Sequence, residues 1–165
     1  IDPGLAFGTG SHETTRLCLE MCEKYMKKGD KVLDVGCGSG VLGIASLLMG
    51  AESAVGVDID DVAVRTAKEN AEINGVADRF TGICGSFTDK VTGKYDIVLA
   101  NIVADAIMFL SKGVKDFMKD DAVYIMSGII DTRAEEVKES VGKDFDIIEE
   151  HLEKGWVCLA AKAKK

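Results

Sequence analysis

Short apolar runs alternate with amphipathic segments along the whole chain. The run from Ile97 to Ala100 has no polar residue, which is typical of a central parallel strand that helices cover on both faces. This alternation predicts an α/β fold with a mostly parallel, seven-stranded sheet and helices between the strands. The expected strands are Lys31 to Val35, Ser53 to Asp58, Arg79 to Cys84, Tyr95 to Asn101, Ala122 to Ser127, Asp144 to His151 and Trp156 to Lys162.

Five helices are expected between these strands, and glycine signals end the first three. Only Leu152 to Gly155 separate the last two strands, which is too short for a helical crossover and predicts an antiparallel hairpin. The final strand is therefore expected to run against an otherwise parallel sheet. The helices are expected from after Ser11 to near Gly29, from after Ser39 to Gly50, from Asp61 to Ile73, from Ala104 to Met118 and from Thr132 to Val141.

Length and charge exclude several classes of protein. The 165 residues leave room for one domain, residues 1–165. The 20 basic and 28 acidic residues give a net charge of −8, so direct binding to nucleic acid is not expected. No apolar run is long enough for a membrane span and no signal peptide is apparent, so a cytoplasmic protein is expected. The five cysteines form no CxxC pair, so neither a disulfide framework nor a metal site is expected.

A glycine loop, Gly36-Cys37-Gly38-Ser39-Gly40, follows the first strand and precedes a helix. Such loops let the backbone approach a ligand at a helix N-terminus. A dinucleotide fingerprint that starts at Gly36 would need a third glycine where Val41 stands. A literal match starts at Gly38, but it would push Gly43 into the helix. The loop therefore argues against a nicotinamide-dependent oxidoreductase, which stays open as an alternative.

Two acidic residues near the loop suggest which ligand it binds. Asp34 would repel a pyrophosphate but could bind a cationic amino group, or it could cap the N–H groups of the loop itself. Asp58 ends the next strand, 22 positions after Gly36, where a carboxylate can accept both ribose hydroxyls. Of Asp60 and Asp61, one is expected to cap a helix. A ligand with a ribose and an amino-acid end is S-adenosylmethionine.

The segment from Asp34 to Gly40, with Asp58 and Asn101, resembles the nucleotide-binding motifs of class I S-adenosylmethionine-dependent methyltransferases. The segment from Asp2 to Thr15 is similar to the PrmA family, the methyltransferases of a large-subunit ribosomal protein. The resemblance covers essentially the whole chain and implies a Rossmann-like fold and N-methylation of protein amino groups. The separate N-terminal domain that presents the ribosomal substrate in this family is expected to be absent.

The resemblance also implies roles for individual residues. Asn101 would be the catalytic residue beside the methyl donor, and its amide carbonyl could accept a hydrogen bond from a substrate amine. A turn-forming asparagine is the alternative. Asp58 would hold the ribose, and Ile59 and the Ser86 region would flank the adenine. The remaining cofactor-binding residues are Thr15, Asp34, Gly36, Gly38 and Gly40.

Other residues leave alternatives open. The segment from Phe7 to Gly10 is either a lid over the ligand or a disordered arm. His12 is a proton acceptor or only a helix-start residue, and Cys37 is reactive only if it is exposed. Cys18 and Cys22 are expected to be buried as small apolar residues. A noncatalytic cofactor-binding module is the alternative to the enzyme as a whole.

Overall fold

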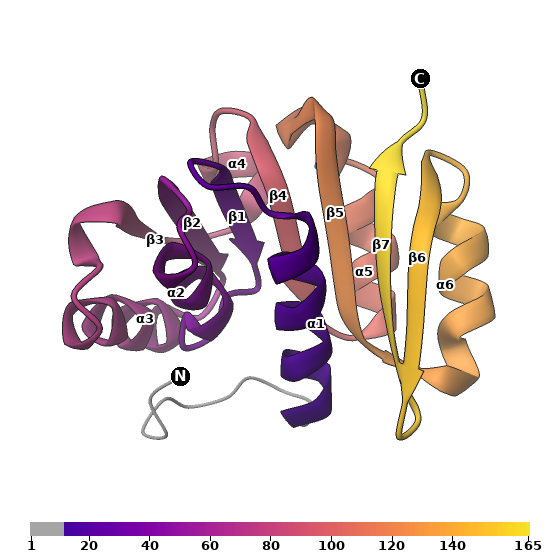
Figure 1. Cartoon of the computed structure of the whole chain (residues 1–165), viewed down its shortest axis with the longest axis horizontal. Coiled ribbons are helices and arrows are strands. Elements are labelled where there is room, and N and C mark those ends of the chain that lie inside the picture. The colour runs from indigo at the N-terminus through magenta and orange to yellow at the C-terminus, as the bar shows by residue number, and fades with distance from the viewer. Residues whose placement is uncertain (1–11) are drawn as a thin grey trace.

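The computed structural model describes residues 12–165, which build one seven-stranded sheet in the order β3-β2-β1-β4-β5-β7-β6 (Figure 1). Strand β7 is antiparallel to both of its neighbours, and the pairs from β3 to β5 are parallel. The predicted fold class is therefore confirmed. The strands are β1 (Lys31–Val35), β2 (Ser53–Asp58), β3 (Phe80–Cys84), β4 (Tyr95–Asn101), β5 (Met118–Ile130), β6 (Phe145–Glu153) and β7 (Trp156–Ala163).

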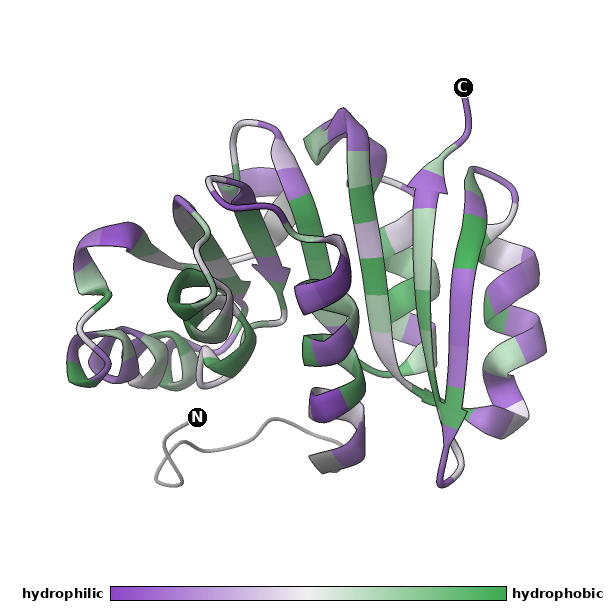
Figure 2. Cartoon of the chain, viewed as in Figure 1, coloured by the Kyte–Doolittle hydropathy of each residue, from purple (hydrophilic) through white to green (hydrophobic). Residues whose placement is uncertain are grey.

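Helices cover both faces of the sheet. Buried side chains of α1, α2 and α3 form one apolar layer, and those of α5 and α6 form the other. Figure 2 shows that α2 is largely hydrophobic, whereas α3 and α6 alternate between hydrophobic and hydrophilic residues, as expected for helices with one face in solvent. The helices are α1 (His12–Tyr25), α2 (Val41–Leu48), α3 (Asp61–Ile73), α4 (Phe87–Lys90), α5 (Ala104–Ser111) and α6 (Ala134–Val141).

Strand β5 is longer than predicted, and the helix before it is shorter. The prediction of a helix from Ala104 to Met118 is wrong: α5 ends at Ser111, and a 3-10 turn spans Val114–Phe117. Met118 instead pairs with Tyr95 at the start of β5, where its side chain is buried. The exposed polar residues 119–121 interrupt the strand register. They also break the apolar pattern of the sequence, which is why the start of this strand was not predicted.

Smaller differences concern the ends of elements. The first helix ends at Tyr25, before the predicted stop near Gly29. Arg79 lies in a 3-10 turn and not in β3, because its backbone N–H donates to the carbonyl oxygen of Val76 at 3.0 Å and so closes the turn. No helix within residues 12–165 is long and apolar enough to cross a membrane.

The predicted hairpin of the last two strands is confirmed. Only Lys154 and Gly155 link β6 to β7, with φ angles of +51° and +83°. Two successive positive φ values are the geometry of a two-residue hairpin turn whose twist matches the strands. β7 lies between β5 and β6, so the last strand is internal to the sheet.

Candidate functional site

The ends of three neighbouring strands place the candidate residues at the carboxyl edge of the sheet. β1 pairs with both β2 and β4, so the chain order reverses on either side of β1. Open α/β sheets bind ligands at such switch points. The loop that starts at Gly36 leaves β1 at this point, Asp58 ends β2, and Asn101 ends β4.

The glycine loop has a backbone that side chains would obstruct. Gly36, Gly38 and Gly40 have φ angles of +69°, +52° and +85°, in the left-handed region that favours glycine. A Cβ atom on Gly36 would lie 2.7 Å from Cγ2 of Ile102. Gly43 lies inside α2, as expected, so the alternative dinucleotide register fails.

Asp58 ties the loop to β2. One carboxylate oxygen accepts a hydrogen bond from the Gly38 N–H at 3.0 Å, and the other accepts from the Asp60 N–H at 3.0 Å. Each oxygen keeps a second lone pair for another donor. Asp60 in turn caps α3 by accepting from the Val62 N–H at 2.9 Å, which confirms the capping expectation for one of the two following acids.

A cavity of about 330 Å³ opens beside the loop, at the lower end of the range for small-molecule sites. Its walls are mostly apolar, and Asp58 lies among them. The structure brings the predicted Ile59 and Ser86 to this same cavity. Sequence reasoning missed the contribution of α5; the available signal was Phe109, an aromatic residue 71% exposed on a largely apolar helix. The lining residues are Val35, Gly36, Val57, Asp58, Ile59, Gly85, Ser86, Ile102, Ala106, Phe109 and Leu110.

A second, smaller cavity of about 30 Å³ adjoins the first at Gly36, which lines both. It brings together Thr15, Asp34, Gly36, Gly38 and Asn101 among the predicted residues. Gly40 is not part of either lining, because it begins α2 and packs against α3.

Asn101 and Thr15 contact each other in the small cavity. Nδ2 of Asn101 donates to Oγ1 of Thr15 at 3.4 Å. Oδ1 of Asn101 is buried and has no hydrogen-bond partner within the described residues 12–165. A buried amide oxygen without a partner is costly, so this atom is a candidate acceptor for a ligand or substrate donor.

Asp34 is buried and is 1% exposed. Its Oδ2 accepts from the N–H of Gly43 at 3.2 Å, so the carboxylate binds an N–H group in the first turn of α2 and not one of the loop itself. Burial raises the pKa of Asp34 to about 7; the Gly43 N–H opposes this rise and the charge of Asp58 adds to it. A cation placed in the small cavity would favour the charged form of Asp34.

The other candidate groups are less suited to chemistry. Cys37 is buried, and burial raises the pKa of its thiol, which makes it a poor nucleophile. Cys18 and Cys22 are buried in the core, as expected. Within residues 12–165, no group of three or more His, Cys, Asp or Glu side chains could hold a metal ion. The proposed lid from Phe7 to Gly10 lies outside the described residues, as does the side chain of His12.

A mostly parallel sheet with a glycine loop, an acidic residue at the end of the second strand and two adjoining cavities at its switch point defines a Rossmann-like nucleotide-binding domain. The chain belongs to the ribosomal protein L11 methyltransferase (PrmA) family, whose model matches residues 1–164. The resemblance inferred from the motifs is thereby confirmed.

Several relatives support this assignment. The chain is 48% identical over 164 residues to the ribosomal protein L11 methyltransferase of Caldicellulosiruptor bescii and 43% identical to that of Caldanaerobacter subterraneus, covering 99% of this chain and 53% of each relative. It is also similar to the crystal structure of a ribosomal protein L11 methylase from Lactobacillus delbrueckii, with a TM-score of 0.90, 32% identity, and coverage of 94% of this chain and 81% of that one. The chain thus spans about half the length of these curated relatives.

Proposed function

We propose that this chain is the cofactor-binding and catalytic part of an S-adenosylmethionine-dependent protein N-methyltransferase that acts on amino groups of ribosomal protein L11. The observation that carries the proposal is the pair of adjoining cavities in a chain of the PrmA family: one is mostly apolar and contains Asp58, and the other has a mixed polar and apolar lining that includes Asp34 and Asn101.

The residues of the two cavities fit S-adenosylmethionine. Ile59, Ile102 and Phe109 offer apolar walls to an adenine ring, and Asp58 has lone pairs left for ribose hydroxyls. Gly36 lines both cavities, and its missing side chain leaves the space beside Ile102 open to a ligand. Asp34 favours a cationic amino group in the smaller one. When bound, S-adenosylmethionine supplies a methyl group on an activated sulfonium leaving group.

Asn101 is proposed to orient the acceptor. Its buried Oδ1 would accept a hydrogen bond from the incoming amine and so aim the nitrogen lone pair, while Thr15 holds the other end of the amide. Fixing the amine in line with the methyl group and excluding water are the contributions that this reaction needs most from a protein.

Selection of the protein substrate is proposed to need more than residues 1–165, which we take to be a single domain. A specific protein interface buries about 800 Å² on each partner. The remaining half of the relatives is a source of such a surface. The chain's net charge of −8 would speed the encounter with a basic substrate but would not select one amine. A ribosomal protein would be met in the cytoplasm.

Two measurements test the proposal. Calorimetry with S-adenosylhomocysteine and with NAD should detect binding of the first alone. Transfer of radiolabelled methyl to purified L11 should then be slow for this chain and fast when the chain is joined to the remaining half of the Caldicellulosiruptor relative.

Any other result of these two measurements would favour a different function or a different way of recognising the substrate. Binding of NAD would favour an oxidoreductase. Binding of S-adenosylhomocysteine without methyl transfer by either form would favour a noncatalytic module. Equal, rapid transfer by both forms would show that the chain recognises L11 unaided.

A further inference from the structure

Strand β5 carries one extra residue beside the candidate site. Met126 pairs with Leu159 and Ile129 pairs with Val157, so two residues of β5, Ser127 and Gly128, lie opposite one residue of β7. This is a β-bulge, and bulges next to active sites re-aim side chains. Ser127 also pairs with Asn101 across the β4–β5 ladder, so the bulge adjoins the Asn101 amide.

The second residue of the bulge has no space for a side chain. Gly128 has a φ angle of +84°, and a Cβ atom there would lie 2.8 Å from the carbonyl oxygen of Ile102 and 2.9 Å from Oδ1 of Asn101. The buried, unpartnered amide oxygen therefore occupies space that only glycine leaves open. On its other side, the same amide donates to Thr15.

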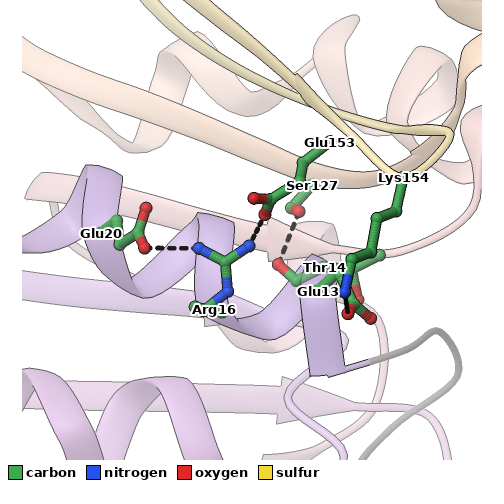
Figure 3. Close-up of polar contacts among 7 residues, drawn as sticks. All are labelled: Glu13, Thr14, Arg16, Glu20, Ser127, Glu153 and Lys154. Carbon is green, nitrogen blue, oxygen red and sulfur yellow. Dashed lines mark hydrogen bonds and ion pairs between the residues drawn. The ribbon is translucent and has the colours of Figure 1, made fainter.

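The first residue of the bulge holds the helix that carries Thr15. The hydroxyl of Ser127 donates to the carbonyl oxygen of Thr14 at 2.7 Å (Figure 3). The β6–β7 hairpin secures the same end of α1, because Lys154 in its turn pairs with Glu13 at 3.1 Å and Glu153 at the end of β6 pairs with Arg16. Both ends of the Asn101 amide thus depend on the bulge: one through Gly128 and the other through Ser127 and α1.

We infer that Gly128 is a positioning residue that fixes the orientation of the Asn101 amide. Its missing side chain lets Oδ1 lie at the bulge while Nδ2 faces Thr15, so that the oxygen, and not the NH₂ group, is the end of the amide without a partner within residues 12–165. The consequence for methyl transfer rests on the proposed function, but the orientation itself does not.

Nuclear magnetic resonance of the wild-type chain tests the orientation without any activity. The sequence has three asparagines and no glutamine, so only three side-chain NH₂ groups give signals in this region of the spectrum. The NH₂ protons of Asn101 should show stronger Overhauser effects to Thr15 than to the α-protons of Gly128. The reverse order of intensities would mean that the NH₂ group faces the bulge and would overturn the inference.

Substitutions at Gly128 test whether the orientation of the Asn101 amide matters for methyl transfer. Gly128→Ala should lower kcat for methyl transfer at least about tenfold and leave the affinity for S-adenosylhomocysteine within about threefold, because small displacements of a positioning group act mainly on the reacting geometry. Gly93→Ala is the matched control: Gly93 has a φ angle of +89° but no described atom within 4 Å of the added Cβ, so it carries the backbone strain without the collision.

A double-mutant cycle separates positioning from general damage to the fold. In the Asn101→Ala background, Gly128→Ala should lower the rate and the melting temperature by less than it does in the wild type, because the collision with Oδ1 of Asn101 is gone and only the one with the Ile102 carbonyl oxygen remains. Equal effects in the two backgrounds would overturn the inference. If Gly128→Ala does not fold, the wild-type resonance measurement still decides the orientation. A wild type that transfers no methyl would refute the proposed function alone.

Discussion

Replacement of Asp34 by asparagine should change how the stability of the domain depends on pH. Asp34 is buried, and burial raises its pKa from the ordinary 3.8 to about 7 in the folded state. The folded state therefore binds more protons than the unfolded chain between about pH 4 and pH 7. As a result, the contribution of Asp34 to the free energy of unfolding falls as pH rises through this window and is constant above it.

The size of the effect follows from the two pKa values. Each unit of difference corresponds to about 1.4 kcal/mol, so the wild type should lose about 4 kcal/mol relative to Asp34→Asn between pH 4 and pH 8. This is large beside the roughly 5 to 15 kcal/mol that stabilise an ordinary domain. Asparagine has the same shape but stays neutral, so the variant lacks this term at every pH.

Urea unfolding followed by circular dichroism at several pH values would measure the difference. Asp61→Asn is a matched control, because it removes a carboxylate that is 73% exposed at the start of α3. A difference between wild type and Asp34→Asn that stays constant from pH 4 to pH 8 would refute the argument, because it would mean that burial does not hold a proton on Asp34.

Three further substitutions test the site. Asp58→Ala removes the acceptor of the Gly38 and Asp60 N–H groups as well as the proposed ribose ligand. It should therefore weaken S-adenosylhomocysteine binding by about 1.5 to 3 kcal/mol and lower the melting temperature. Unchanged affinity in calorimetry would remove Asp58 from the site. Gly36→Val places a branched side chain at a φ of +69° and against Ile102, so binding should be lost, and a folded variant with normal affinity would contradict the assigned role of the loop. Asn101→Ala should reduce single-turnover methyl transfer more than affinity, whereas equal losses would indicate a structural asparagine.

Sequence patterns predicted correctly those elements whose structure depends on residues close to one another in the chain. The apolar run of β4 and the short link before β7 determined a buried strand and a hairpin, and both are present. Where burial depends on distant partners, local patterns failed. The residues next to Met118 in the sequence predict a helix, but in the structure Met118 pairs with Tyr95 on another strand.

The same division holds for the candidate site. Asp58 and the glycine loop were recognisable because strand ends at one edge of a parallel sheet must lie close together. The contact between Asn101 and Thr15 joins residues 86 positions apart, and the bulge at Gly128 depends on a register between β5 and β7. Nothing in the spacing of single residues encodes either feature.

The internal position of β7 has a consequence for the order in which the domain assembles during synthesis. β6 is made before β7, yet it has no other neighbour in the sheet, so it cannot join until β7 has paired with β5. β6 and the turn therefore reach their places in the sheet only once residues 156–163 have been made and have paired. Glu153 at the end of β6 and Lys154 in the turn pair with Arg16 and Glu13 of α1, so the helix that carries Thr15 gains these two ion pairs only when β6 has joined β7 in the sheet. A nascent chain that lacks its last strand should thus have the glycine loop but an unsecured start of α1.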